Sequence, residues 1–210
     1  VGNRMDRNGN GIAGETSDFY VGTLDLQSAD LAVVAVTLPE NAVFGSPVTF
    51  EWTVRNIGSD PAREGWRDQA WLSTDPNLDS ADIPLFAPAV APPTGAVPLE
   101  AGATYSQIAT AVLPLSNSLN SGTYYIIVKT DANSQQPENN ENNNTRRETL
   151  AITLPPLPDL IVSHIDAPIE AFSGQTIQYS WTVTNQGNAA AAGTWRDRVL
   201  LSSDQNAGND

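Results

Sequence analysis

Apolar and polar residues alternate along several short runs of this chain, which is the pattern of β-strands with one buried and one solvated face. The clearest run is residues 48–55, VTFEWTVR, where every second residue is apolar. Residues 122–130, GTYYIIVKT, have the strongest content of strand-forming residues. Further strands are predicted over residues 31–38, 66–74, 104–113 and 149–154. No comparable run has a helical period, so the pattern predicts an all-β chain.

One stretch of this pattern occurs twice. Residues 50–75, FEWTVRNIGSDPAREGWRDQAWLSTD, return as residues 179–204, YSWTVTNQGNAAAAGTWRDRVLLSSD. Trp52 matches Trp181 and Trp66 matches Trp195, and the numbers in both pairs differ by 129. This offset holds from Asp30/Asp159 to Asn77/Asn206 without insertion or deletion. The chain therefore encodes one structural unit twice, and the second copy is shorter. The copy has Val199 and Leu201 in place of Ala70 and Leu72, so these two residues are expected to face inward. Residues 87–98 are too rich in proline for a central strand and are expected to form an edge or loop.

The repeat and the strand spacing predict the domain organisation. Residues 29–154 are expected to form an immunoglobulin-like, seven-stranded antiparallel β-sandwich with partial β units on either side. The prolines of residues 155–158 predict a short, stiff linker. Residues 159–210 are expected to hold the first three strands of the second copy, with an exposed core face and an open edge. Because the chain starts at Val1 and stops inside a repeat, we expect it to be a fragment of a longer protein.

Charge narrows the range of partners. The net charge is −14, and Lys129 is the single lysine among ten basic residues. This field repels nucleic acid and anionic membranes, so neither is an expected partner. No apolar run reaches the roughly 18 residues of a membrane-spanning helix, and membrane insertion is not expected. The chain has no cysteine, so its stability cannot depend on disulfides.

Oxygen-rich loops are the candidate metal sites. Hard cations such as Ca²⁺ bind six to eight oxygens, and a D-x-N-x-N-G loop supplies several of them. The N-terminal set has this pattern, with a backbone carbonyl at its seventh position and an acidic residue to close it: Asp6, Asn8, Asn10, Ile12, Glu15 and Asp18. Two weaker sets are Asp75, Asn77, Asp79 and Asp82, and Asp131, Asn133, Glu138 and Glu141. We hypothesise that calcium in one or more of these loops stiffens interdomain junctions; the alternative is that the loops are solvated turns.

The residues kept in both copies have structural interpretations. Trp52 lies on the apolar face of its strand and is expected in the core. Trp66 is expected to pack in the core or at its rim, or, together with Trp71, to form a platform for sugar. Asp68 is expected to accept hydrogen bonds from loop backbone at the start of a strand. Asn56 and Gly58 indicate turn chemistry, namely an Asx-type bond and a residue free to take a positive φ.

Signatures of catalysis are missing from the sequence. The single histidine, His164, corresponds to Ala35 in the first copy, so the unit does not require it. The chain has no cysteine nucleophile, Ser/His/Asp set, zinc-ligand spacing or phosphate-binding loop. The expectation is that the protein is not an enzyme.

Several motifs in order resemble the CARDB domain, the cell-adhesion-related domain found in bacteria. They are DLAVVAVTLP, FEWTVRNIG, W-R-D-x-x-W-L-S-T-D, SGTYYIIVKTDAN and E-N-N-E-N-N-N-T. The resemblance covers residues 30 to about 154 fully and 159–210 in part. It implies a β-sandwich in tandem arrays within large secreted or surface proteins. Residues 1–26 are similar to the C-terminal loop and strand of a bacterial immunoglobulin-like domain.

The resemblance implies a non-catalytic structural or adhesion segment of a large extracellular bacterial multidomain protein at the cell surface. A first alternative is a polymerising filament subunit that is completed by strand addition between subunits. A second is an accessory module of a secreted enzyme that binds carbohydrate or protein. The expected partners are neighbouring domains of the same chain or identical subunits, with cell-surface glycan or protein as a further class.

Overall fold

A computed structural model describes residues 28–203 of the chain, and this part is built of β-strands without a helix. The segment 1–26 and the metal-ligand candidates from Asp6 to Asp18 lie outside the described residues. No helix within 28–203 has the length and apolar character needed to cross a bilayer. The strands are β1 (Leu31–Thr37), β2 (Asn41–Val43), β3 (Pro47–Asn56), β4 (Gln69–Ser73), β5 (Ile83–Pro84), β6 (Thr104–Val112), β7 (Gly122–Lys129), β8 (Thr145–Thr153), β9 (Leu160–Asp166) and β10 (Ser180–Asn185).

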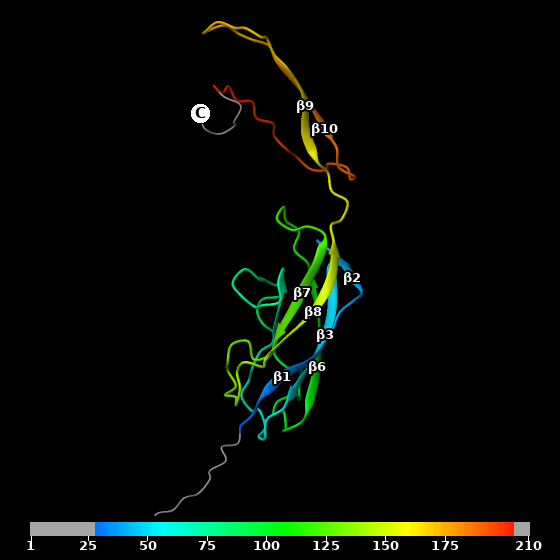
Figure 1. Ribbon diagram of the computed structural model, residues 1–210, viewed down its shortest axis with the longest axis vertical. Coiled ribbons are helices and arrows are strands. Elements are labelled where there is room, and N and C mark those ends of the chain that lie inside the picture. The colour runs from blue at the N-terminus through cyan, green and yellow to red at the C-terminus, as the bar shows by residue number, and fades with distance from the viewer. Residues whose placement is uncertain (1–27, 204–210) are drawn as a thin grey trace, which may run out of the picture. The chain divides into compact units, whose positions relative to one another are not determined.

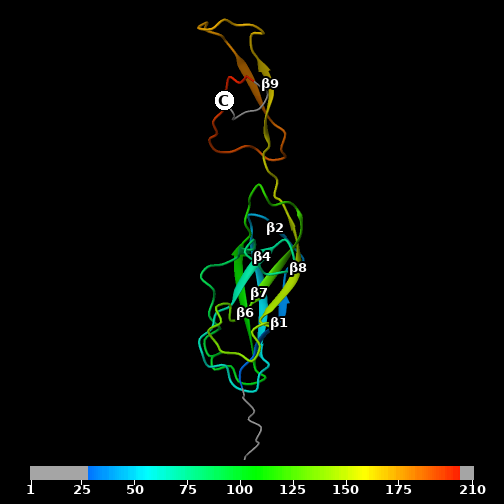
Figure 2. The same ribbon diagram turned by 60° about the vertical axis from the view of Figure 1, so that its left-hand side comes forward.

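The first eight strands form two sheets. One has the order β1-β3-β6 and the other the order β2-β8-β7-β4-β5. In Figure 1, β7 and β8 run side by side, and in Figure 2, β4 lies beside β7. The chain was expected to form seven antiparallel strands, whereas residues 31–153 hold eight, and β2 pairs with β8 in parallel. Two of the eight, β2 and β5, match none of the six runs named from the sequence, because they have only three and two residues, too few to produce a recognisable alternation.

One compact unit comprises residues 28–39, 49–111 and 124–150. Its core follows the alternation read from the sequence, because Phe50, Trp52 and Val54 of β3 are buried while the residues between them are more exposed. Ala70 and Leu72 of β4 are also buried, as expected. Phe86 stacks against Trp52 with ring centroids 6.2 Å apart. The sequence therefore specified the inward face of these strands correctly.

The proline-rich segment 87–98 forms no strand and lies beyond the short edge strand β5. It is held by isolated bridges, Asp68 with Val90 and Ala62 with Leu99. Proline cannot donate to a β-ladder, which accounts for the missing pairing. The expectation of an edge or loop here is confirmed.

The other compact unit comprises residues 40–48, 112–123 and 151–203. Within it, β9 and β10 form an antiparallel pair in which Trp181 lies opposite Ile165. Residues 195–203 form no strand, although a third strand was expected there. In the first copy the equivalent strand, β4, pairs only with β5 and β7. Residues 28–203 contain no counterparts of β5 and β7 in the second copy, so the described part of the chain offers this segment no such neighbour.

Candidate functional site

A buried carboxylate, Asp68, is the hydrogen-bonding centre of the first unit. Its Oδ2 accepts bonds from the indole nitrogen of Trp52 at 2.8 Å and from the hydroxyl of Tyr105 at 2.7 Å. Its Oδ1 accepts a bond from the hydroxyl of Thr130 at 2.8 Å. Asp68 precedes β4, Trp52 lies in β3, Tyr105 in β6, and Thr130 follows β7. One side chain therefore links segments from both sheets.

The charges around Asp68 favour a structural role. Burial raises the pKa of Asp68, against the hydrogen bonds from Tyr105, Trp52 and Thr130, which lower it. Burial and the neighbouring carboxylate raise the pKa of Tyr105, so its hydroxyl stays protonated and can donate. All these side chains are closed to solvent, with Asp68 and Thr130 fully buried. The arrangement can hold strands together but offers no route for a substrate.

The expected role of Asp68 was incomplete. A bond from the backbone of Asp131 contributes to its environment, but its main donors are side chains. Sequence reasoning missed Tyr105 and Thr130 as partners. One signal was available, because a buried tryptophan N–H needs an acceptor and Asp68 is kept together with Trp52 in both copies.

Asn56 uses its full hydrogen-bonding capacity. Its Oδ1 accepts bonds from the N–H groups of Asp30, at 3.1 Å, and Gly58, at 3.0 Å. Its Nδ2 donates to the carbonyls of Asp60, at 2.7 Å, and Leu99, at 2.9 Å. Two donors and two acceptors are all that an asparagine amide offers. The bond to Gly58 is the predicted Asx turn, the bond to Asp60 lies in the same turn, and the other two reach Asp30 and Leu99, 26 and 43 residues away.

Gly58 has a different role from the predicted one. Its φ is not among the positive values of the described glycines. Instead, a Cβ at this position would overlap the backbone of Ser28 and Ala29, lying 2.6 Å from the carbonyl carbon of Ala29. Glycine is needed because two backbone segments approach closely here.

The paired-tryptophan platform is not formed. Trp66 is only 1% exposed, and its indole nitrogen donates to the Tyr105 hydroxyl at 3.0 Å. Trp71, in β4, is half-buried. Because the Trp66 ring lies in the core, it cannot present a face to a sugar.

The loop between β7 and β8 contains one of the predicted acidic sets, and Asp131 in it is occupied by backbone contacts. Its two oxygens accept bonds from the N–H groups of Gln135, at 2.7 Å, and Gln136, at 2.9 Å. Asp131 has a φ of 42°, in the left-handed region. Asn133 and Glu141 are exposed. Asp131 therefore shapes the loop, with one backbone N–H bonded to each of its carboxylate oxygens.

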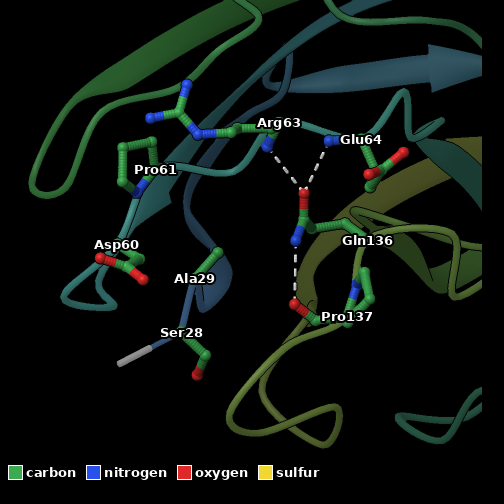
Figure 3. A pocket seen from close by; sticks show the side chains of 8 residues that line it. All are labelled: Ser28, Ala29, Asp60, Pro61, Arg63, Glu64, Gln136 and Pro137. Atoms are coloured by element: carbon green, nitrogen blue, oxygen red, sulfur yellow. Dashed lines mark hydrogen bonds between the residues drawn. The ribbon is translucent and has the colours of Figure 1, made fainter. Parts of the chain in front are cut away.

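Gln136 joins this loop to the segment before β4. Its Oε1 accepts bonds from the N–H groups of Arg63, at 2.8 Å, and Glu64, at 2.9 Å, and its Nε2 donates to the carbonyl of Pro137 (Figure 3). A shallow polar hollow of about 350 Å³ lies beside it. It is lined by Ser28, Ala29, Asp60, Pro61, Arg63, Glu64, Gln136 and Pro137.

Glu138 is the one member of this acidic set with buried and unpaired oxygens. Neither Oε1 nor Oε2 has a hydrogen-bond partner in the protein. Burial raises the pKa of Glu138 to about 7, and the charges of Glu141 and Asp131 raise it further, against the amide of Asn144 and the backbone of Leu31. The latter two lie close enough to stabilise the anion, but neither forms a hydrogen bond of good geometry.

In the loop after β4, the second acidic set binds its own backbone. Oδ1 of Asp75 accepts the N–H of Asn77 at 2.7 Å, and Oδ1 of Asp79 accepts that of Ala81 at 2.7 Å. Oδ2 of Asp82 accepts the N–H of Asp79 at 2.8 Å. Between residues 28 and 203, no three His, Cys, Asp or Glu side chains gather as a group that could hold a metal ion.

The second copy repeats the main contacts of the first. Trp181 donates to Oδ2 of Asp197 at 3.0 Å, as Trp52 does to Asp68. Oδ1 of Asn185 accepts the N–H groups of Asp159 and Gly187, both at 3.0 Å. The difference is exposure, because Trp181 is 39% exposed and Trp52 is fully buried.

One family model matches most of the chain. The model of the family described as CARDB matches residues 28–148 and 157–209. No curated protein matches the chain. Among solved structures, a CARDB domain from Pyrococcus furiosus in complex with di-metal ions is 16% identical, with a TM-score of 0.44, over 63% of this chain and 100% of that one. A β-glucosidase from Listeria innocua is 15% identical, with a TM-score of 0.38, over 71% of this chain and 21% of that one.

Proposed function

The chain belongs to the CARDB family, and from that premise we propose that it is a non-catalytic structural segment of a large extracellular bacterial protein that acts in adhesion. The observation that carries this proposal is how the repeated residues are used. The polar groups of Trp52, Asn56 and Asp68 form hydrogen bonds that connect strands and turns within the unit. Gly58 permits two backbone segments to approach. The residues that both copies share therefore have structural roles.

The same premise supports an immunoglobulin-like arrangement repeated in tandem. The sheet β1-β3-β6 matches strands A, B and E of that fold, and the order β8-β7-β4 matches G, F and C. The Asn185 turn and the Trp181–Asp197 bond support a second copy of the unit after residue 157. We propose that residues 1–26 belong to a preceding immunoglobulin-like domain and that its D-x-N-x-N-G loop binds calcium.

A replacement experiment tests the structural role. In the cell that makes the parent protein, residues 29–154 are deleted or exchanged for an unrelated β-sandwich of similar length. A spacer role predicts that deletion lowers adhesion and that the exchange restores it. If the exchange fails to restore adhesion although the protein reaches the surface, the segment binds a ligand itself and the proposal is wrong.

A filament subunit is the second candidate, and one observation favours it. Val162, Ile165 and Val199 are 56%, 68% and 51% exposed. At the offset of 129, their counterparts are Val33, Val36 and Ala70, of which Val33 and Ala70 are buried in the first unit. The exposed side chains therefore form the core face of an incomplete sheet pair, which strands of another subunit could cover.

Sedimentation distinguishes the filament from the spacer. A filament subunit should form larger species as concentration rises, and Ile165→Glu should abolish them. His164→Glu is the matched control, because adjacent residues of β9 point to opposite faces. A chain that stays monomeric at all concentrations overturns the filament and leaves the spacer role intact.

A further inference from the structure

Glu138 presents an unusual combination of burial and isolation. It forms a parallel bridge with Ala29, and the N–H of Asn139 donates to the Ala29 carbonyl at 2.9 Å, so the backbone at this point is held against the start of β1. The residue is partly exposed, yet both carboxylate oxygens are buried without a hydrogen-bond donor. An ionised carboxylate in this state is costly unless a cation or a donor compensates it.

No cationic side chain within residues 28–203 pairs with Glu138. The ion pair found among residues 28–203 joins Arg146 to Glu148 and does not involve Glu138. The nearest charges that act on Glu138 are those of Glu141 and Asp131, both negative. The surroundings therefore attract a cation from solution.

A second side chain is buried beside Glu138 without partners. Asn144 is completely buried, and neither its Oδ1 nor its Nδ2 has a hydrogen-bond partner in the protein. Its backbone carbonyl accepts the N–H of Thr130 at 3.0 Å, which anchors the residue at the start of β8. Its side-chain amide acts on the Glu138 carboxylate, so the two groups face the same space.

The adjacent residue, Asn143, also has a buried oxygen without a partner. Its Nδ2 donates to Oδ1 of Asp30 at 2.8 Å, next to Leu31, whose backbone acts on Glu138. Its Oδ1 is buried and has no partner. Carboxylate and amide oxygens without competing donors are the ligands that a hard cation takes.

We propose that Glu138 and Asn144 form a calcium site between the start of β1 and the loop 131–144, with the Oδ1 of Asn143 as a further ligand. Calcium suits irregular oxygen ligands, whereas Mg²⁺ demands a near-ideal octahedron. The site differs from the set predicted by sequence, because it leaves out Asp131, whose two carboxylate oxygens already accept backbone N–H groups. The inference goes beyond the adhesion role and does not depend on it.

Calorimetry and NMR on the complete 210-residue chain test the site. Calcium chloride is titrated into chelator-treated protein, and the amide signals of Asn143, Asn144 and Leu31 are followed. With one carboxylate ligand, we expect a Kd of about 10⁻⁴ to 10⁻³ M, the range of extracellular calcium modules, and weaker binding of Mg²⁺. Absence of binding, or binding that leaves these signals unchanged, overturns the site.

Three variants locate the ions. Glu138→Gln should weaken binding about tenfold or more, whereas the control Glu141→Gln should weaken it less than about threefold, because ligand charge sets affinity. Asn144→Asp should tighten binding by adding a carboxylate. Glu138→Gln removes an unpaired buried charge and should therefore remain folded in chelator. If Glu138→Gln and Asn144→Asp both bind calcium as the parent does, the site is wrong.

The N-terminal loop is a separate candidate for calcium binding and is tested with a variant of its own. If Asp6→Asn removes calcium binding while Glu138→Gln retains it, the ion belongs to the N-terminal loop, and the site proposed at Glu138 is wrong while the earlier proposal stands. If Glu138→Gln alone removes binding, the reverse holds. If Asp6→Asn and Glu138→Gln each remove a separate part of the calcium binding, the chain has two sites.

Discussion

The indole nitrogen of Trp52 donates a 2.8 Å hydrogen bond to Oδ2 of Asp68, sixteen residues further along the chain. Trp181 and Asp197, again sixteen residues apart, make the same bond at 3.0 Å. The first pair is buried and the second is exposed to solvent. The chain thus contains the same hydrogen bond once in a buried and once in a solvent-exposed environment. We expect the difference in burial to decide how much each bond contributes to stability.

Asp68→Ala should destabilise the chain strongly. The change leaves three buried donors, on Trp52, Tyr105 and Thr130, without their acceptor, and each such loss costs about 1–3 kcal/mol. We expect a total of about 3 kcal/mol or more in the free energy of unfolding, measured with urea. Asp197→Ala is the matched control and should change the unfolding of the first unit little. Equal effects would show that burial is not the cause.

Tyr105→Phe removes the hydroxyl that links Trp66 to Asp68 in the hydrogen-bond network and should destabilise the chain. The hydroxyl accepts from Trp66 and donates to Asp68, so its removal leaves the Trp66 N–H without an acceptor. The expected loss is about 1–3 kcal/mol, measured by urea unfolding followed through tryptophan fluorescence. Tyr125→Phe, in β7, removes the same atom outside this network. A loss no greater than that of the control contradicts the assigned role.

Gly58→Ala should be far more harmful than Gly65→Ala. The added Cβ at Gly58 would overlap the backbone of Ser28 and Ala29, and overpacking of this kind costs about 1–3 kcal/mol. At Gly65 nothing lies within 4 Å of the Cβ, so alanine there should be neutral or slightly stabilising. Thermal unfolding measures the difference, and equal melting temperatures for the two variants would contradict the close backbone approach at Gly58.

The stability contributed by Asp68 should fall as pH rises. Burial raises its folded-state pKa above the ordinary value of an aspartate, so the folded state binds the proton more tightly than the unfolded state. The contribution is fully present below the unfolded pKa and is lost as pH rises through the folded pKa. The difference in unfolding free energy between the parent and Asp68→Asn, measured across this range, should therefore decrease with pH. An increase would mean that the hydrogen bonds outweigh burial.

Much of the fold follows from local pattern. The alternation in residues 48–55 identified the buried face of β3, and the matching of the two copies identified Ala70 and Leu72 as core. Short strands escaped prediction, because β5 has two residues and depends on the β4 backbone beside it. The missing strand at residues 195–203 shows the same dependence, since alternation specifies a face but a ladder needs a neighbour.

Part of the candidate site could also be predicted from the sequence, and the rest required the structure. Composition singled out Asp131 and Glu138 together as oxygen donors. Only their surroundings separate them, because backbone N–H groups occupy the oxygens of Asp131 and leave those of Glu138 unpaired. Asn144 carried no signal in a run of asparagines, and its complete burial came from the docking of the loop against the start of β1.

The sequence alone determined the class of fold, the repeated unit and the inward-facing residues, since these depend on the order of apolar and polar side chains along a strand. The tertiary structure decided what the polar residues do. Asp68 meets Tyr105 and Thr130 across 37 and 62 residues of chain, and such partners are chosen by the packing of sheets. The carboxylate of Asp68 connects strands and that of Asp131 accepts hydrogen bonds within its loop, whereas that of Glu138 is unpaired. These roles differ because burial and the available hydrogen-bond donors differ at each position.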